Sequence, residues 1–298
     1  MTSTNLRRSQ DNGNKRRSDF GSYDYSPRDD RGLLLTAQQK FIAYDHLGQH
    51  LAPNLEPALD EPEDEQENLL RSHGGRRNAL PWPQDRRKRL HAVAEIVRRW
   101  EKKMGFAESW KPWANEPPWA RITALGLRNL GLDWNEIPFP EDRHRLSITS
   151  HTYLISQMRL HLARGGSNAP THIWISEHEI EAANSKTTGQ HFPHRPDGIL
   201  VLQTDSSFPL KRGDTLLEEI PLKRGQRIAI EVECSRKSFE RLGNHILPSL
   251  LEHYDFGWYF CGNKEVYDTI VAARRMYLPT DEERKRIRIL LMEEKGLK

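Results

Sequence analysis

The chain has 298 residues and a formal net charge of +3, with 29% charged and 36% hydrophobic residues. A mean hydropathy of −0.80, and no apolar run near the roughly 18 residues of a spanning helix, exclude a membrane-embedded protein. Two cysteines, Cys234 and Cys261, are too few for a disulfide framework or a cysteine-based zinc site. No signal peptide is recognisable, so we expect a cytoplasmic protein of about two domains.

Charges are segregated along the first third of the chain. Residues 1–32 and 71–89 are rich in Arg and Lys, whereas residues 56–67 are rich in Asp and Glu. Basic tracts of this kind fit a nucleic-acid partner, but they also fit solvated tails and a charged helix face. Composition alone favours the second interpretation.

The N-terminal third is predicted to contain little regular structure before its basic helix. Residues 1–32 combine low hydrophobicity with many turn formers, which predicts a disordered basic arm. A helix is expected over 33–47, and the prolines and acids of 48–83 predict a linker.

A strong basic helix is predicted over 84–104, with apolar residues at helical spacing and Arg and Lys opposite. A tryptophan-rich ribbon over 110–119, a short strand at 120–123 and a helix over 124–132 follow. This order fits the second half of a winged helix.

The remainder of the chain alternates predicted helices and strands. In chain order we expect a helix over 144–164, strand 172–175, helix 177–184, strands 198–203 and 226–233, helix 236–251, strand 256–261 and helix 264–276. This order implies a partly parallel sheet with a crossover connection. The last segment, 280–298, is predicted to be a charged helix.

Three acids stand at the ends of predicted strands. Asp197 begins one strand, and Glu231 and Glu233 alternate by two in the next, so the two glutamates share a sheet face. Carboxylates so placed can hold Mg²⁺ beside a phosphodiester and lower the pKa of its water. Arg236 and Lys237, where the next helix is expected to begin, would neutralise the acids or contact phosphate.

Each of these residues also has a structural interpretation. Glu231 and Glu233 would be solvated acids on an edge strand, and Asp197 would be a turn residue in Pro-Asp-Gly. His194 could be a ligand or proton donor, but a surface or capping role is favoured. Arg195 is expected to anchor a neighbouring carbonyl or carboxylate.

Several segments resemble the replication-relaxation family of plasmid and mobile-element proteins. The segments that carry the resemblance are 119–127, 174–177, 194–198, 230–238 and 258–260. The resemblance implies a winged-helix DNA-binding domain joined to a domain similar to the PD-(D/E)xK nucleases, with a role in plasmid replication control. Asp197 and Glu231 match the nuclease motif, but Glu233 stands where the motif has lysine. Lys237, expected one helical turn later, would supply that charge.

The predicted fold class is therefore α+β or α/β, with a winged-helix-like region followed by a PD-(D/E)xK-like mixed sheet flanked by helices. The expected divisions are a disordered basic arm at 1–32, a winged-helix-like DNA-binding region at 33–135 with an acidic linker at 48–83, a nuclease-like domain at 144–278 and a charged helix at 279–298.

The predicted sites divide into two groups. The expected DNA contacts are Arg86, Arg87, Lys88, Arg98, Arg121 and Arg236. The expected catalytic residues are Asp197, Glu231, Glu233 and Lys237, with Mg²⁺ on the three acids.

The resulting hypothesis is a DNA-binding protein of a plasmid or mobile element, involved in replication control, whose partner is double-stranded DNA. Two alternatives stay open: an active Mg²⁺-dependent endonuclease and a non-catalytic protein-interaction module. A homodimer and contacts with replication or mobile-element proteins also stay open.

Overall fold

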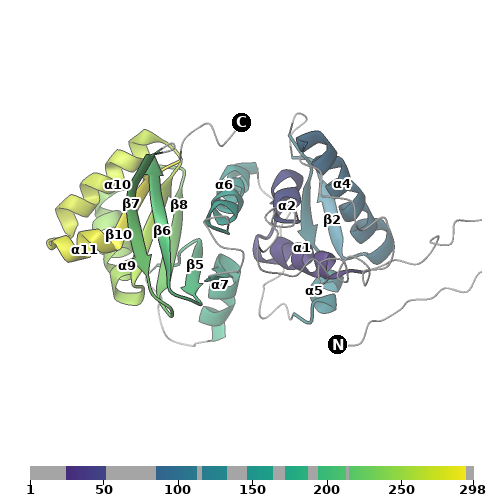
Figure 1. Cartoon of the computed structure of the whole chain (residues 1–298), viewed down its shortest axis with the longest axis horizontal. Coiled ribbons are helices and arrows are strands. Elements are labelled where there is room, and N and C mark those ends of the chain that lie inside the picture. The colour runs from purple at the N-terminus through teal and green to yellow at the C-terminus, as the bar shows by residue number, and fades with distance from the viewer. Residues whose placement is uncertain are drawn as a thin grey trace, which may run out of the picture.

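The structure is a computed structural model that describes residues 25–51, 85–112, 116–132, 146–163, 172–186, 194–212 and 215–292. The chain has an α+β fold with a small sheet in its N-terminal half and a five-stranded mixed sheet in its C-terminal half (Figure 1). Within the described ranges, no helix is long and apolar enough to cross a membrane.

The N-terminal half packs its helices around a three-stranded antiparallel sheet of order β1-β3-β2. Its elements are α1 (Pro27–Gln38), β1 (Ile42–Ala43), α2 (Tyr44–Leu51), α4 (Arg86–Arg99), the π-helical turn η1 (Trp100–Met104), β2 (Ala107–Trp110), β3 (Trp119–Ile122) and α5 (Ala124–Asn129). The basic helix predicted over 84–104 is confirmed as α4 and its π-helical extension. The single helix predicted over 33–47 is wrong, because the chain turns at Lys40, whose φ is 63°.

The predicted disordered arm (1–32) ends too late, because α1 already begins at residue 27. Asp29 accepts hydrogen bonds from the backbone N (2.9 Å) and Oγ (2.8 Å) of Ser26, which fixes the first turn. Gly32, a poor helix former, is required by packing, since a Cβ there would lie 2.7 Å from Cη2 of Trp100.

The acidic linker predicted over 48–83 also begins later than expected. Helix α2 continues to Leu51, which is 1% exposed and packs into the N-terminal core. Apolar burial therefore extends the helix beyond the glycine at position 48. Residues 1–24 and 52–84, which hold the rest of the predicted arm and linker, lie outside the described residues.

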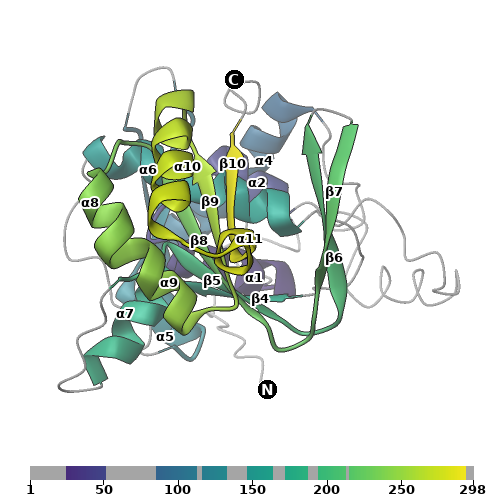
Figure 2. The same ribbon diagram turned by 90° about the vertical axis from the view of Figure 1, so that its left-hand side faces the viewer.

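The C-terminal half is a sheet of order β10-β9-β8-β5-β4 with cover on both faces (Figure 2). Its elements are α6 (Leu146–Ala163), β4 (His172–Ser176), α7 (Glu177–Lys186), β5 (Gly198–Leu202), β6 (Ser206–Arg212), β7 (Thr215–Leu222), β8 (Arg227–Glu233), α8 (Phe239–Arg241), η2 (Leu242–Ile246), α9 (Leu247–His253), β9 (Phe256–Cys261), α10 (Lys264–Tyr277), α11 (Asp281–Arg286) and β10 (Ile287–Leu291). Helix α6 and the β6–β7 hairpin cover one face, and η2, α9 and α10 cover the other.

The predicted strands of this half are confirmed, and the sheet is partly parallel as expected. Strands β4, β5 and β8 pair antiparallel, whereas β8, β9 and β10 are parallel. The charged helix predicted for 279–298 is wrong over 287–291, which form strand β10, and residues 293–298 lie outside the described residues. Ile287, 0% exposed, starts an edge strand that pairs along β9 from Gly257, because its apolar side chain belongs in the core.

The two halves meet along α6 and α7, which lie between the N-terminal helices and the large sheet in Figure 1. Phe41 and Trp119 are each 2% exposed, and they form an apolar cluster with Tyr153 of α6. Arg159 of α6 also donates a hydrogen bond to Gln38 of α1 (2.5 Å). The contact between the halves therefore has both an apolar and a polar part.

Candidate functional site

The predicted acids do meet where β5 begins and β8 ends. The antiparallel register pairs Gly198 with Ile230, which brings Asp197 beside the last residues of β8. Asp197 Oδ2 accepts a hydrogen bond from the backbone N of Val232 at 2.7 Å. The Pro-Asp-Gly segment therefore joins two strands through its carboxylate instead of forming a solvated turn.

Glu231 and Glu233 lie on a central strand, so their interpretation as solvated acids on an edge strand is wrong. They are 3% and 5% exposed and sit opposite Tyr259 and Cys261 of β9. Burying a carboxylate is costly unless a donor or cation compensates it. Each glutamate has such a partner.

His194 is the partner of Glu231. Its Nε2 lies 2.7 Å from Glu231 Oε1, and its side chain is 12% exposed, so the surface role favoured for it is wrong. Burial raises the pKa of Glu231, and the hydrogen bond from His194 opposes that shift.

Lys237 forms an ion pair with Glu233. Burial acts to lower the pKa of Lys237, but the carboxylates of Glu231, Glu233 and Asp197 outweigh it and raise the pKa. Lys237 is expected to lie one helical turn after Glu233. This prediction is wrong, because helix α8 begins only at Phe239, with Ser238 as its N-cap. The lysine reaches the acids from that loop.

The three acids are not gathered into one ligand set. Within the described residues, no group of three or more His, Cys, Asp or Glu side chains is placed to hold a metal ion. Asp197, Glu231 and Glu233 are instead matched one by one by protein donors or cations. The Mg²⁺ expected on these three acids therefore stays a prediction.

His151 of α6 belongs to the same site, and sequence patterns did not single it out. Its Nε2 lies 2.9 Å from the carbonyl oxygen of Val232 and 3.3 Å from Asp197 Oδ2. Both neighbours are acceptors, so Nε2 carries the proton. Burial acts to lower the pKa of His151, but hydrogen bonding and charge from Asp197 outweigh it and raise the pKa.

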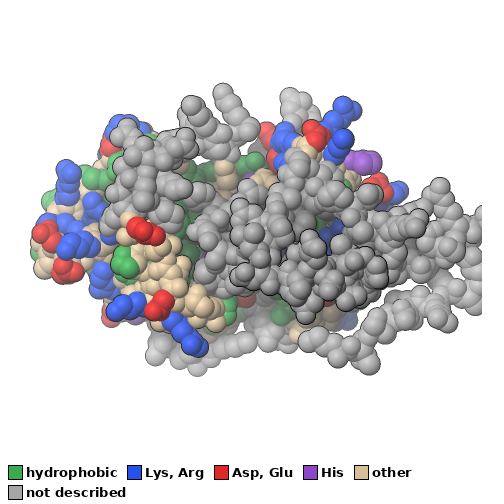
Figure 3. Space-filling view, in the orientation of Figure 1, with side chains coloured by type: hydrophobic (Ala, Val, Ile, Leu, Met, Phe, Trp, Pro, Cys, Tyr) green, Lys and Arg blue, Asp and Glu red, His purple; other side chains and the backbone are tan. Residues whose placement is uncertain are grey.

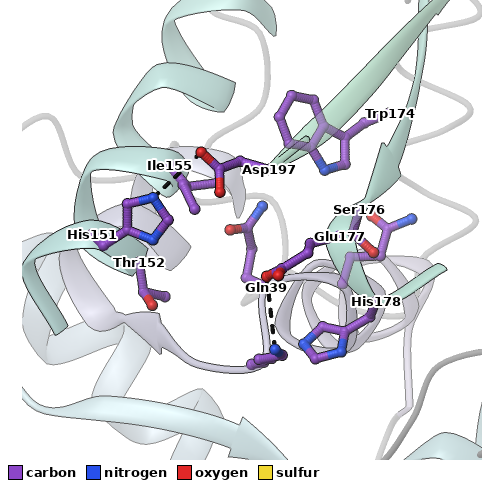
Figure 4. Close-up of a pocket in the computed structure, with 11 residues that line it drawn as sticks. Gln39, His151, Thr152, Ile155, Trp174, Ser176, Glu177, His178 and Asp197 are labelled. Carbon is purple, nitrogen blue, oxygen red and sulfur yellow. Dashed lines mark ion pairs between the residues drawn. The ribbon is translucent and has the colours of Figure 1, made fainter. Parts of the chain in front are cut away.

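A cavity of about 240 Å³ opens beside Asp197, between the two halves (Figure 4). The residues that carry its chemistry are Lys40, His151, Trp174, Glu177, His178 and Asp197. Lys40 Nζ lies 3.7 Å from Glu177 Oε2. As expected, Arg195 anchors a carboxylate, because it pairs with Glu177 at 2.8 Å.

The expected DNA contacts differ in whether they are already neutralised. Four are ion-paired within the chain: Arg86 with Asp45 (2.8 Å), Arg98 with Glu95 (2.5 Å), Arg121 with Glu108 (2.5 Å) and Arg236 with Glu265 (3.4 Å). Arg87 and Lys88 are exposed on α4, and neither has an ion-pair partner within the described residues. Figure 3 shows Lys and Arg side chains over α4, at the upper right.

Comparison of the chain with protein-family models, curated proteins and solved structures found no match.

Proposed function

We propose that the chain is a DNA-binding protein that docks on duplex DNA through α4 and the β2–β3 hairpin. The observation that carries this proposal is the exposed pair Arg87 and Lys88 at the start of α4. Exposed arginine and lysine side chains can neutralise phosphates, which supplies most of the affinity of non-specific DNA binding.

The order of elements in the N-terminal half supports this proposal. It runs α1, β1, α2, α4, β2, β3, with a sheet of order β1-β3-β2. A winged-helix interpretation makes α4 the helix that enters the major groove and the β2–β3 hairpin the wing. The apolar side of α4, including Val93 and Val97, is buried in the core, which leaves the basic side facing outward.

The C-terminal half supports a restriction-endonuclease-like interpretation. Its order is helix α6, then strands β4, β5 and β8, which pair antiparallel and are interrupted by helix α7 and the β6–β7 hairpin, and then a helical connection to the parallel strand β9. Asp197 precedes β5, and Glu231 and Glu233 lie on its neighbour β8. The resemblance to replication-relaxation proteins adds plasmid or mobile-element replication control to the proposal.

Binding of a fluorescent duplex by the whole chain, measured by anisotropy over a salt series, tests the proposal. We expect Arg87→Ala and Lys88→Ala each to weaken binding about fivefold and to reduce the salt slope by about 0.9, as for one lost phosphate contact. The control is Lys285→Ala, an exposed lysine of α11 that pairs with Glu282. No affinity for any duplex at low salt would reject DNA binding.

A second candidate is a Mg²⁺-dependent endonuclease, favoured by the junction of Asp197, Glu231, Glu233 and Lys237. The acids are the residues that would hold the ion, which would supply Lewis-acid activation of water. Their present partners would have to be displaced first. Cleavage of plasmid DNA with Mg²⁺ or Mn²⁺, lost in Asp197→Asn but kept in Lys285→Ala, would support this candidate. Equal background in wild type and Asp197→Asn would reject it.

A further inference from the structure

The cavity between the halves has a size and a position that suit a small ligand. Its volume of about 240 Å³ lies below the roughly 300–1,000 Å³ of sites for drug-sized molecules. It is lined by Lys40 from the N-terminal half and by His151 and Glu177 from the C-terminal half, so a bound ligand would touch both halves. Figure 4 shows His151 and Glu177 on either side of this space. One planar ring system matches this space better than a larger molecule.

The charges around the cavity are balanced in pairs. Lys40 lies 3.7 Å from Glu177, and His151 lies 3.3 Å from Asp197. An added phosphate would sit near two carboxylates, and an added cation near an ammonium group. This lining therefore favours a ligand that is neutral and polar.

Two buried side chains of the lining have polar atoms with no hydrogen-bond partner among the described residues. They are Nε1 of Trp174, which is 6% exposed, and both ring nitrogens of His178, which is 4% exposed. Buried polar atoms are nearly always hydrogen-bonded, so unpaired ones beside a cavity indicate a missing partner. The indole nitrogen is a donor, and a neutral imidazole offers one donor and one acceptor.

The indole ring of Trp174 is already packed against other residues of the chain. The guanidinium carbon of Arg159 lies 5.4 Å from the ring centroid, and a Cβ at Gly198 would lie 2.3 Å from Cζ2 of the indole. Trp174 can therefore offer its N–H edge more readily than a stacking face. The ligand must be recognised by hydrogen bonds along its own edge.

We propose that this cavity receives one nucleobase of DNA that has left the base stack. A base is neutral and planar and carries donors and acceptors on its edge, as the lining requires. Asp197 lies in both the cavity wall and the acidic site, so an extruded base would bring its phosphodiester close to the carboxylates. The inference rests on the proposed DNA binding for its source of bases.

Binding of free 2′-deoxynucleosides to the whole chain tests the ligand class without DNA. Saturation-transfer NMR with each of the four nucleosides should detect binding of at least one to wild type, and inorganic phosphate should not compete. His178→Phe, which keeps a ring but removes both nitrogens, should weaken binding roughly tenfold. His253→Phe, the same change at an exposed position of α9, should leave it unchanged.

If His178→Phe fails to fold, Ile155→Phe provides the second test, because Ile155 lines the cavity and a larger side chain would fill it. No nucleoside binding to wild type, or binding of phosphate alone, would overturn the proposal. Unchanged nucleoside affinity in folded Ile155→Phe would do the same, because it would place the nucleoside outside the cavity.

A duplex carrying 2-aminopurine at a mismatch tests the source of the base. Its fluorescence should rise when wild type binds and should not rise with His178→Phe, while the anisotropy of both complexes stays the same. Duplex binding without the rise in fluorescence would overturn the proposal that the cavity receives a base, but it would still support DNA binding. Nucleoside binding without duplex binding would overturn the proposed DNA-binding function, but it would still support a nucleobase as the ligand of the cavity.

Discussion

Acidification from pH 7 to pH 5 should destabilise the protein through His178. Burial lowers the pKa of His178 to about 3, and the charges of Lys40 and Arg195 act in the same direction. Glu181 Oε2 lies 4.0 Å from Nδ1, too far for a hydrogen bond. The unfolded chain binds a proton near pH 6.5 and the folded chain only near pH 3, so the free energy of unfolding falls as pH drops through that window.

The magnitude follows from the same window. Each pH unit below about 6.5 removes about 1.4 kcal/mol from the free energy of unfolding, so pH 5 removes about 2 kcal/mol through this one group. Above pH 6.5 the imidazole is neutral in both states and the loss vanishes.

Urea unfolding of wild type and His178→Phe at pH 7 and pH 5 measures this effect. Other groups titrate in both proteins, so the difference between their pH dependences isolates the imidazole. Wild type should lose about 2 kcal/mol more than His178→Phe between the two pH values. His253→Phe should behave as wild type. Equal losses in wild type and His178→Phe would mean that the folded protein protonates this imidazole without cost, and the reasoning would be wrong.

Three substitutions test the packing and the charge pairs by urea unfolding at pH 7. Lys237→Met leaves the buried carboxylate of Glu233 without its cation and should cost about 2–4 kcal/mol; no loss would show that the pair is not needed. Asp29→Asn should cost about 2–3 kcal/mol, because the buried carboxylate accepts from a guanidinium, an indole and its N-cap residue. Gly32→Ala should destabilise by about 1–2 kcal/mol through collision with Trp100, whereas a gain would show that helix propensity outweighs packing there.

Local sequence patterns predict those helices and strands whose residues are all buried, or alternate regularly between buried and exposed, along the whole element. The apolar run at 256–261 is strand β9 with the same bounds, because every residue from 257 to 261 is buried. Strand β10 escapes prediction, because the charged run before Ile287 is helical and only pairing with β9 makes the next residues a strand. The first half of helix α1, before residue 33, is not predicted, because Gly32 is a poor helix former whose place there depends on packing against Trp100, far along the chain.

In the acidic site, too, some contacts follow from the local sequence and others depend on tertiary contacts. The meeting of Asp197 with Glu231 follows from two strands that pair antiparallel, one led and the other ended by acids. The roles of His151 and His178 do not follow from their neighbours in sequence, because each side chain is given its partners or its burial by elements that approach from elsewhere. Hydrogen-bond partners that come from distant parts of the chain leave no pattern in the sequence around a residue.

The apolar cluster of Phe41, Trp119 and Tyr153 makes the two halves poor candidates for exchange between proteins. Cutting the chain between β3 and α6 would expose aromatic rings on both fragments, and each fragment would tend to aggregate through them. The N-terminal half, transplanted onto another C-terminal half, would need a matching aromatic surface to receive it. Exchange of one half for that of another protein should therefore succeed only where Phe41, Trp119 and Tyr153 are all kept, or where the contacting residues of both halves are replaced together.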